Sequence, residues 1–398
     1  MSKSPCPYFK TCGGCQLMDF SYGEQLELKK KMVENSLADE GLTALTVKPV
    51  LGMKIPWYYR NKVQFPIRRQ NNRLQMGYFM KGTHEVVNIN ECLIQDPNLT
   101  EIARQARVIF EDRDLSAYDE KTGQGVLRHF VARSSLRTNE VFLGLVINGR
   151  KLPAAFSVAA EIKKRERTMQ RLAAKCSDYP QAGEKKRIVG IVQNSNNSRG
   201  NVILGQQNTT LFGTPFYKEK LGRFFFMVRL NSFFQVNPIM AERLYNIVKE
   251  LADLTGAETV VDAYAGLGAI AFWVAENAAK VICIEENEEA AADTLKNARA
   301  NHLGNIVVEP GTVERKIGRR MDVLILDPPR SGVSELALKQ ILGHTPKTII
   351  YVSCNPKTLA RDVRRLLEAG YHAEDVQPLD MFPQTDHVEA VIKLQRPV

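Results

Sequence analysis

The sequence lacks the segments that would indicate a membrane protein or an exported one. Charged residues interrupt the longest apolar stretches within about a dozen positions, well short of a membrane span. The N-terminal stretch MSKSPCPYFKTCGG has no apolar core of the kind found in signal peptides. Internal repeats and low-complexity tracts are also missing. We therefore expect a cytoplasmic globular protein that has no membrane partner and is monomeric.

Cysteine is scarce, and its distribution does not suit a disulfide framework. The seven cysteines stand at positions 6, 12, 15, 92, 176, 283 and 354. Their number is odd, and three of them fall close together near the N-terminus. In a chain without a signal peptide, such a group more often binds metal or takes part in catalysis.

Acidic residues are outnumbered by basic ones. Lys and Arg total 54 against 44 Asp and Glu, which leaves a formal net charge of +10 and a sequence pI of about 9.2. A surplus of this kind is typical of proteins that contact phosphate backbones. Judged by charge alone, a basic surface that contacts only solvent is as good an explanation as nucleic-acid binding.

The pattern of apolar residues changes along the 398-residue chain and predicts three parts. The first part, 1–50, carries the cysteines and an amphipathic helix over 16–41. The second, 51–230, contains Cys92 and reads as short strands, with one basic helical insertion at 154–176. The third, 231–398, alternates helices and apolar strands, which predicts a doubly wound, mostly parallel α/β sheet of the Rossmann type. Its expected helices are 238–253, 268–278, 287–301, 334–342 and 357–369, and its expected strands are 259–264, 280–285, 305–311, 322–329, 348–354 and 390–396.

The first strand–helix turn of the third part has the features of a nucleoside site. Asp262 closes the strand, and Gly266-Leu267-Gly268 permits close approach of the backbone to a ligand. The next strand ends in Glu285, at the spacing of an acid that binds ribose hydroxyls. The third glycine of a dinucleotide fingerprint is missing. A nucleoside cofactor such as S-adenosylmethionine therefore fits better than NAD.

Two later strands carry further candidates to the same edge of the predicted sheet. One ends in Asp327-Pro328-Pro329-Arg330, and the other in Ser353-Cys354-Asn355-Pro356. Asn355 is a natural N-cap and Pro356 a natural first helical residue. Cys354 should then lie at a helix N-terminus, where the helix dipole favours the thiolate. Cys283, in the middle of a strand, is better read as a buried structural cysteine.

Together these segments resemble the uridine-5 methyltransferase family that acts on ribosomal and transfer RNA. The resemblance extends over nearly the whole chain and includes the segments 231–237, 359–362 and 383–389. It implies that Cys354 is the nucleophile and Glu389 the general base. It also implies an S-adenosylmethionine site formed by Gln235, Tyr264, Glu285 and Asp327. Larger members of the family carry an N-terminal OB-like domain, whereas this sequence starts at the cysteine group.

The N-terminal cysteines look like the [4Fe–4S] site of the iron–sulfur branch of that family. That site would consist of Cys6, Cys12, Cys15 and Cys92. Without the resemblance, four cysteines at this spacing favour a structural zinc ion. The arrangement differs from the three-cysteine spacing of radical S-adenosylmethionine enzymes.

The resemblance implies methylation of carbon 5 of a uridine through a covalent adduct on carbon 6. A thiolate suits that addition, and a base must then remove the proton on carbon 5. The group of cysteines favours 23S rRNA as the substrate, with tRNA as the alternative. A DNA cytosine methyltransferase would place its cysteine in another motif. An iron–sulfur RNA-binding protein without catalysis would not need Cys354 and Glu389.

RNA binding should weaken steeply with salt, because Lys and Arg release counterions when they contact phosphates. The contacts are expected from 59–62 and from the basic stretch 163–171. Filter binding or anisotropy between about 50 and 200 mM salt should show a negative log–log slope of about 0.7–0.9 per phosphate contact. Affinity that does not change with salt would contradict an RNA-binding role for the basic middle part.

Overall fold

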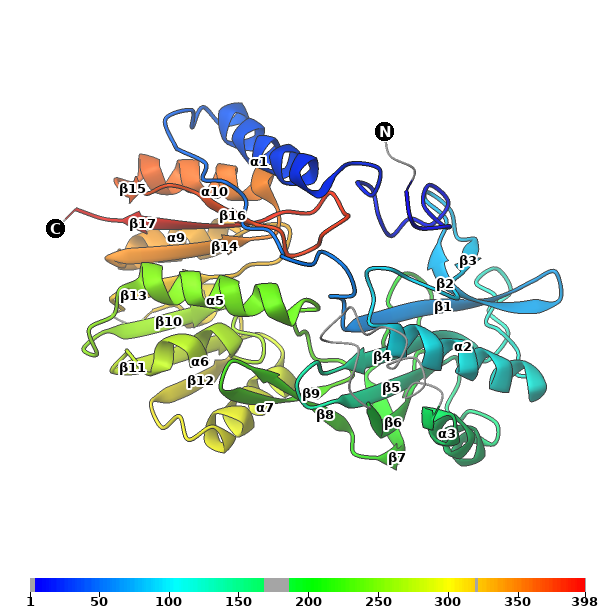
Figure 1. The fold of residues 1–398 in the computed structure, drawn as a ribbon. Helices are drawn as coiled ribbons and strands as arrows, with labels where there is room; N and C mark the ends of the chain where they lie inside the picture. Colours follow the sequence, from blue (N-terminus) through cyan, green and yellow to red (C-terminus); the bar gives the residue numbers. More distant parts are fainter. Residues whose placement is uncertain (1–3, 168–185, 319–320, 398) are drawn as a thin grey trace.

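The computed structural model describes residues 4–167, 186–318 and 321–397, which form two large sheets lying side by side (Figure 1). The predicted basic insertion therefore lies partly outside the described residues, from 168 onward, as does Cys176. None of the described helices is long and apolar enough to cross a membrane. The mixed α/β fold with a β-rich part agrees with the fold class expected from the sequence.

The first sheet has the strand order β3-β2-β1-β4-β5-β6-β7. Neighbouring strands are antiparallel except for β5 and β6, which are parallel and are joined through helix α3. Its strands are β1 Lys62–Gln70, β2 Arg73–Phe79, β3 Val86–Asn88, β4 Leu127–Ser134, β5 Glu140–Ile147, β6 Arg187–Ser195 and β7 Gln207–Gly213.

The β-rich part contains a helix that the sequence analysis did not predict. Helix α2, Pro97–Asp112, begins where the Asp96 side chain accepts from the backbone N–H of Asn98 at 2.9 Å. An Asp-Pro helix start of this kind is readable from sequence, but the flanking strand pattern obscured it. Helix α3, Ala155–Lys164, is shorter than the expected insertion in its described part. Both helices bury apolar faces in one core with β1, β4 and β5.

The second sheet has the order β12-β11-β10-β13-β14-β17-β15, with β16 also paired to β17. Strands β10 to β14 are parallel, whereas β17 runs antiparallel to β14. Helices α5, α6 and α7 pack on one face of the sheet, and α1, α8, α9 and α10 on the other. The strands are β10 Thr259–Ala263, β11 Lys280–Glu285, β12 Ile306–Pro310, β13 Val323–Leu326, β14 Thr348–Ser353, β15 His372–Ala373, β16 Gln377–Leu379 and β17 Glu389–Gln395, and the helices are α5 Pro238–Ala252, α6 Ala269–Ala275, α7 Glu288–Ala300, α8 Val313–Lys316, α9 Glu335–His344 and α10 Pro356–Glu368.

The N-terminal helix α1, Tyr22–Asp39, begins later than residue 16, where the periodicity placed it. The start is set by a capping box: the Ser21 N–H donates to Glu24 Oε2 at 2.7 Å, and the Glu24 N–H donates to Ser21 Oγ at 3.4 Å. Residues 16–20 precede the helix and contact the C-terminal part of the chain instead. Gln16 and Leu17 donate their backbone N–H groups to the carbonyl of Gln384.

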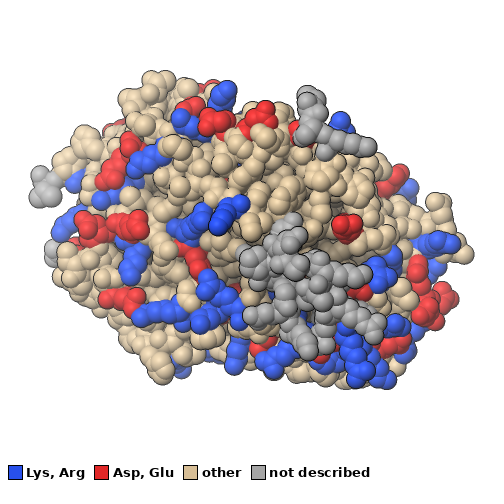
Figure 2. All heavy atoms as spheres, viewed as in Figure 1, with Lys and Arg blue, Asp and Glu red and all other residues tan. Residues whose placement is uncertain are grey.

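A shared core joins the two sheets. It includes side chains of β4 and β5, of the hairpin β8 Phe216–Leu221 and β9 Phe224–Arg229, and of α5 and α6. Arg133 on β4 donates to the carbonyls of Leu230 and Ser232, so the first sheet holds the segment that enters the second. Lys and Arg side chains on one face of the molecule are interspersed with Asp and Glu and are frequent along its lower edge (Figure 2).

Candidate functional site

A cavity of about 580 Å³ opens at the carboxyl edge of the parallel strands. This edge is where ligands bind in open α/β sheets, and the strand order reverses here between β10 and β13. The cavity is lined by the segment 231–235, by the turns after β10, β11 and β13, and by the start of β17. It brings together all the predicted cofactor and catalytic residues, namely Gln235, Tyr264, Glu285, Asp327, Cys354 and Glu389.

The cavity is crowded with carboxyl groups. Asp262 is buried; its Oδ2 accepts from the Ala271 N–H at 3.0 Å, and its Oδ1 has no hydrogen-bond partner among the described residues. Burial, and then the charge of Asp327, raise the pKa of Asp262 to about 8. Burial also raises the pKa of Asp327 to about 7. Such a site favours a ligand that brings positive charge.

Glu285 supports the glycine turn and faces the same cavity. Its Oε2 accepts from the Gly266 N–H and its Oε1 from the Asn287 N–H, both at 2.8 Å. Gly266 and Gly268 have positive φ angles of 56° and 76°, which the tight turn requires. Each carboxylate oxygen keeps lone-pair capacity for a further donor, as binding of ribose hydroxyls would need.

Cys354 and Glu389 are brought together by strand pairing. In the antiparallel β14–β17 pair, Ser353 is opposite Ala390, so the next residue pair along is Cys354 and Glu389. Glu389 is buried, and its pKa is raised well above the ordinary value by burial and then by the charge of Asp327. Arg330 opposes that rise, and it also lowers the pKa of Cys354. The sequence motif contained Arg330 but did not reveal that its charge acts on both groups.

The prediction that the surroundings of Cys354 favour the thiolate is wrong. The N-cap is as expected, with Asn355 Oδ1 accepting from the Lys357 N–H at 3.2 Å and Pro356 in the first turn. The pKa of Cys354 is nevertheless raised, mainly by burial and then by the charge of Glu389. Desolvation and a neighbouring carboxylate both favour the neutral thiol.

Two aromatic side chains in the cavity were not singled out from the sequence. Phe233 is 68% exposed, although it lines the cavity, and Phe382 lies on the loop before β17. An exposed Phe beside an enclosed polar site is a candidate surface for stacking a base. The only sequence signal was its place within the Asn231–Asn237 segment.

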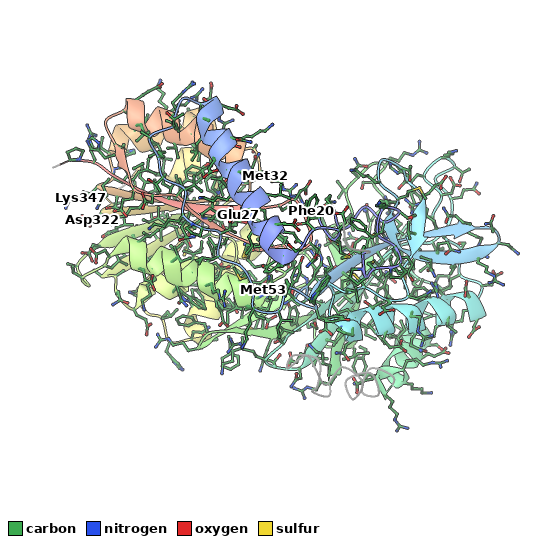
Figure 3. All side chains as sticks on the ribbon, turned by 45° about the horizontal axis from the view of Figure 1, so that its top comes forward. Phe20, Glu27, Met32, Met53, Asp322 and Lys347 are labelled. Carbon is green, nitrogen blue, oxygen red and sulfur yellow. The ribbon has the colours of Figure 1, made fainter. Side chains whose placement is uncertain are left out.

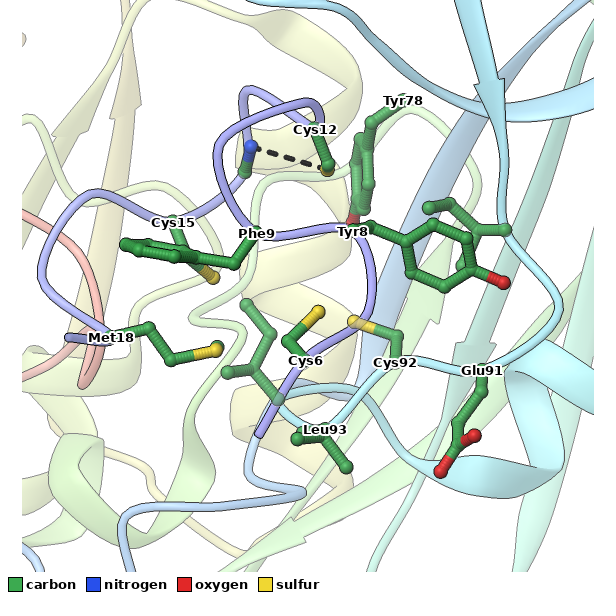
Figure 4. A pocket seen from close by; sticks show the side chains of 13 residues that line it. Cys6, Tyr8, Phe9, Cys12, Cys15, Met18, Tyr78, Glu91, Cys92 and Leu93 are labelled. Atoms are coloured by element: carbon green, nitrogen blue, oxygen red, sulfur yellow. Dashed lines mark hydrogen bonds between the residues drawn. The ribbon is translucent and has the colours of Figure 1, made fainter. Parts of the chain in front are cut away.

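A second cavity is lined by the four proposed cluster ligands, Cys6, Cys12, Cys15 and Cys92 (Figure 4). The backbone N–H of Gly14 donates to Cys12 Sγ at 3.4 Å. Burial raises the pKa of Cys12 and Cys15, and it raises that of Cys92 to about 11. Among residues 4–167, 186–318 and 321–397, no three His, Cys, Asp or Glu side chains are arranged to hold a single metal ion.

Comparison with known proteins gives consistent relatives. Residues 318–397 match the family model described as tRNA (Uracil-5-)-methyltransferase. An uncharacterized RNA methyltransferase of Halalkalibacterium halodurans is 38% identical over 99% of this chain and 83% of its own length. Another from Clostridium acetobutylicum is 37% identical over 98% of this chain and 83% of its own length.

A solved structure resembles nearly the whole fold. The Pyrococcus abyssi tRNA (uracil-54, C5)-methyltransferase in complex with S-adenosyl-L-homocysteine has a TM-score of 0.74 and 26% sequence identity. The likeness covers 96% of this chain and 86% of that one. It therefore includes both sheets and not the α/β part alone.

The raised pKa values predict how the cavity selects its ligand. Because the pKa values of Asp262 and Asp327 are above their ordinary values, the ligand-free protein should lose stability as pH rises from about 4 to about 8. A sulfonium would offset that loss. S-adenosylmethionine should therefore gain affinity relative to S-adenosylhomocysteine between about pH 6 and pH 8.5, by roughly tenfold, or about 1.4 kcal/mol.

Isothermal titration calorimetry with both ligands measures this ratio. The two ligands share the same amino and carboxyl groups, so their difference isolates the sulfonium charge. Asp262→Asn should flatten the pH dependence while keeping an acceptor for the Ala271 N–H. A ratio that is constant across this pH range would contradict the electrostatic account.

Proposed function

Because this chain belongs to the uracil-5 RNA methyltransferase family and is an S-adenosylmethionine-dependent RNA methyltransferase, we propose that it methylates a uridine through a covalent enzyme–RNA adduct. The observation that carries the proposal is the pairing of β14 with β17. It puts a thiol and a buried carboxyl side by side at the edge of the cavity that suits the methyl donor.

In the proposed reaction, Cys354 is the nucleophile and adds to carbon 6 of the uracil. The addition makes carbon 5 electron-rich enough to accept a methyl group. S-adenosylmethionine would supply that methyl group from its sulfonium and leave as S-adenosylhomocysteine. Glu389 then takes the proton from carbon 5, and the bond between Cys354 and carbon 6 breaks to release 5-methyluridine.

The environment of the two groups is consistent with these roles. Glu389 has a raised pKa, and a carboxylate with a raised pKa is a stronger base toward carbon once it is ionised. Arg330 stabilises negative charge on Cys354 and on Glu389. A donor that carries positive charge in the same cavity should favour both ionised forms.

The donor is proposed to lie along the turns after β10, β11 and β13. Glu285 would bind the ribose hydroxyls, and Gln235, Tyr264 and Asp327 would contact the rest of the molecule. Asp262 lines the same cavity, and its Oδ1 has no hydrogen-bond partner among the described residues. A buried carboxyl oxygen without a partner supports a positively charged ligand group there.

We propose 23S rRNA as the substrate, with tRNA as the second candidate. The group of four cysteines supports the first, by resemblance to the iron–sulfur branch of the family. The structural likeness to an enzyme acting on tRNA supports the second. Methylation assays with both purified RNAs distinguish them.

The four cysteines are proposed to hold a [4Fe–4S] cluster that has a structural or RNA-positioning role. The thiols come from two distant segments and converge on one cavity, as a shared ligand requires. A single zinc ion would need the sulfurs at about 2.3 Å from one centre. A cluster would instead bind each thiolate through a different iron.

Replacing the two proposed catalytic residues should have different effects. Cys354→Ala should abolish both methylation and the covalent complex, because no group remains to activate carbon 5. Glu389→Gln should slow turnover by roughly 10²–10⁴-fold and trap methylated RNA on the protein. Radiolabelled methyl transfer and a denaturing gel that resolves the RNA–protein band measure the two effects.

Cys283→Ala is the matched control, because this cysteine is buried within β11 and does not line the cavity. It should retain both methylation and release. Normal turnover by Glu389→Gln would transfer the role of base to Asp386 or His387. A covalent complex formed by Cys354→Ala would disprove the proposed mechanism.

Protein purified without oxygen should be brown and contain about four iron and four sulfide ions per chain. Replacement of Cys92 by Ser should remove most of the iron, whereas Cys283→Ser should leave it unchanged. Iron and acid-labile sulfide analysis with absorption spectra checks this. Colourless protein with one zinc ion per chain would contradict the cluster.

A further inference from the structure

The face with which α1 packs on the second sheet is unusually polar. Besides Ser36, its buried positions recur every four residues, at Gln25, Lys29, Val33 and Leu37. The last two are apolar and contribute to the core. The Lys29 side chain is fully buried, although burial of an ammonium group is costly unless it is paired. The structure around Lys29 should therefore show why a charge is placed there.

Lys29 is bound to the loop that leads into β17. Its Nζ lies 2.5 Å from Oδ1 of Asp380, which is also fully buried, and it donates to the carbonyl of Phe382 at 3.1 Å. The other oxygen of Asp380 accepts from the Tyr22 hydroxyl at 2.9 Å. Two residues of one helix therefore hold both oxygens of a single carboxylate at the start of the loop.

The same loop is held at consecutive backbone carbonyls by different segments of the chain. The donors are Asn237 Nδ2 to Met381 (2.9 Å), Lys29 Nζ to Phe382 (3.1 Å), the Tyr59 hydroxyl to Pro383 (2.9 Å), and the N–H groups of Gln16 and Leu17 to Gln384 (3.1 and 3.0 Å). Surface loops ordinarily have fewer such contacts. Most of these donors belong to the N-terminal segment.

Gln25 completes the attachment one helical turn before Lys29. Its Nε2 donates to Gln384 Oε1 at 2.9 Å, and its Oε1 accepts from the Gln384 N–H at 3.0 Å. Gln384 has a φ of 72°, in the left-handed region that a residue other than glycine rarely adopts. Such a conformation persists where the surroundings hold it in place.

The loop matters because it ends at Glu389. Residues 380–388 connect β16 to β17, and Leu379 pairs directly with Glu389 across that hairpin. Phe382, whose carbonyl Lys29 binds, lines the catalytic cavity together with Glu389. Helix α1 extends from the side of the second sheet toward the β-rich half, with Phe20 near that end and Met32 farther along (Figure 3).

We propose that Lys29 and Gln25 are positioning residues, which act through the 380–384 loop to set Glu389 against Cys354. The proposal rests on the proposed function, because it assigns the loop to the step in which Glu389 acts. An apolar pair could replace Lys29 and Asp380 without loss of packing. The charged Lys29 instead fixes the position of the loop, because it binds both the Asp380 carboxylate and the carbonyl of Phe382.

Lys29→Met tests this by removing the charge and keeping the length of the side chain. Methyl transfer in a single turnover should change less than about threefold. Release of the RNA from Cys354 should slow by tenfold or more, since small displacements of a catalytic group have large effects. Lys31→Met is the control, because Lys31 lies two residues along the same helix and is exposed.

A second substitution separates positioning from general destabilisation. In Lys29→Met the Asp380 carboxylate is left buried without its cation, and Asp380→Asn removes that charge while keeping an acceptor for Tyr22. The double variant should therefore release RNA faster than Lys29→Met alone. Amide hydrogen exchange should quicken at 381–388 in Lys29→Met, remain unchanged in α5, and slow again in the double variant.

Three results would overturn the proposal. One is release of RNA by Lys29→Met at the same rate as by Lys31→Met. Another is an equal loss of donor binding, methyl transfer and release, which would show a purely structural role. The third is unchanged exchange at 381–388. Failure of Glu389→Gln to trap the adduct would instead disprove Glu389 as the base, and hydrogen exchange would still decide whether Lys29 holds the loop.

Discussion

Antiparallel pairing of β17 with β14 is the interaction on which the candidate active site depends. A purely parallel sheet would deliver its functional residues from the turns that follow each strand. Here the last strand runs the opposite way, so its first residue, Glu389, lies at the edge where β14 ends and Cys354 begins the next turn. Backbone hydrogen bonds thus fix the separation of two side chains that are far apart in sequence. The rest of the cavity is built around this pair.

The same arrangement makes ionisation of the carboxyl groups in the cavity unfavourable. Asp262, Asp327 and Glu389 share one enclosed region, and burial raises the pKa of each because ionisation would place a charge away from water. The charge of Asp327 raises the pKa of Asp262 and of Glu389 further. Arg330 lowers the pKa of Glu389, but that pKa remains raised. A positively charged methyl donor would lower the cost of ionising these carboxyl groups further. The cavity is therefore well suited to such a ligand. The raised pKa of Cys354 has the same origin.

The N-terminal segment connects the two halves of the molecule to this site. Gln16, which follows Cys15 directly, donates to the loop before β17, and α1 holds that loop through Gln25 and Lys29. The cysteine cavity and the loop are therefore neighbours along a short stretch of chain. Arg133 of the first sheet binds the carbonyl of Ser232 at the cavity wall. Both the β-rich part and the N-terminus thus contribute to the shape of an α/β site.

The alternating elements after residue 238, the N-cap at Asn355 and the gathering of acids and Cys354 at one sheet edge could be predicted from the sequence. These features depend on periodicity and on residues a few positions apart. The sequence did not reveal helix α2, the antiparallel direction of β17, the raised pKa of Cys354 or the buried partner of Lys29. Helix α2 has a local Asp-Pro start that the flanking strand pattern obscured, whereas the other three features depend on the tertiary structure. Strand direction, desolvation and ion pairing depend on side chains brought together from distant segments, and local sequence carries no record of those neighbours.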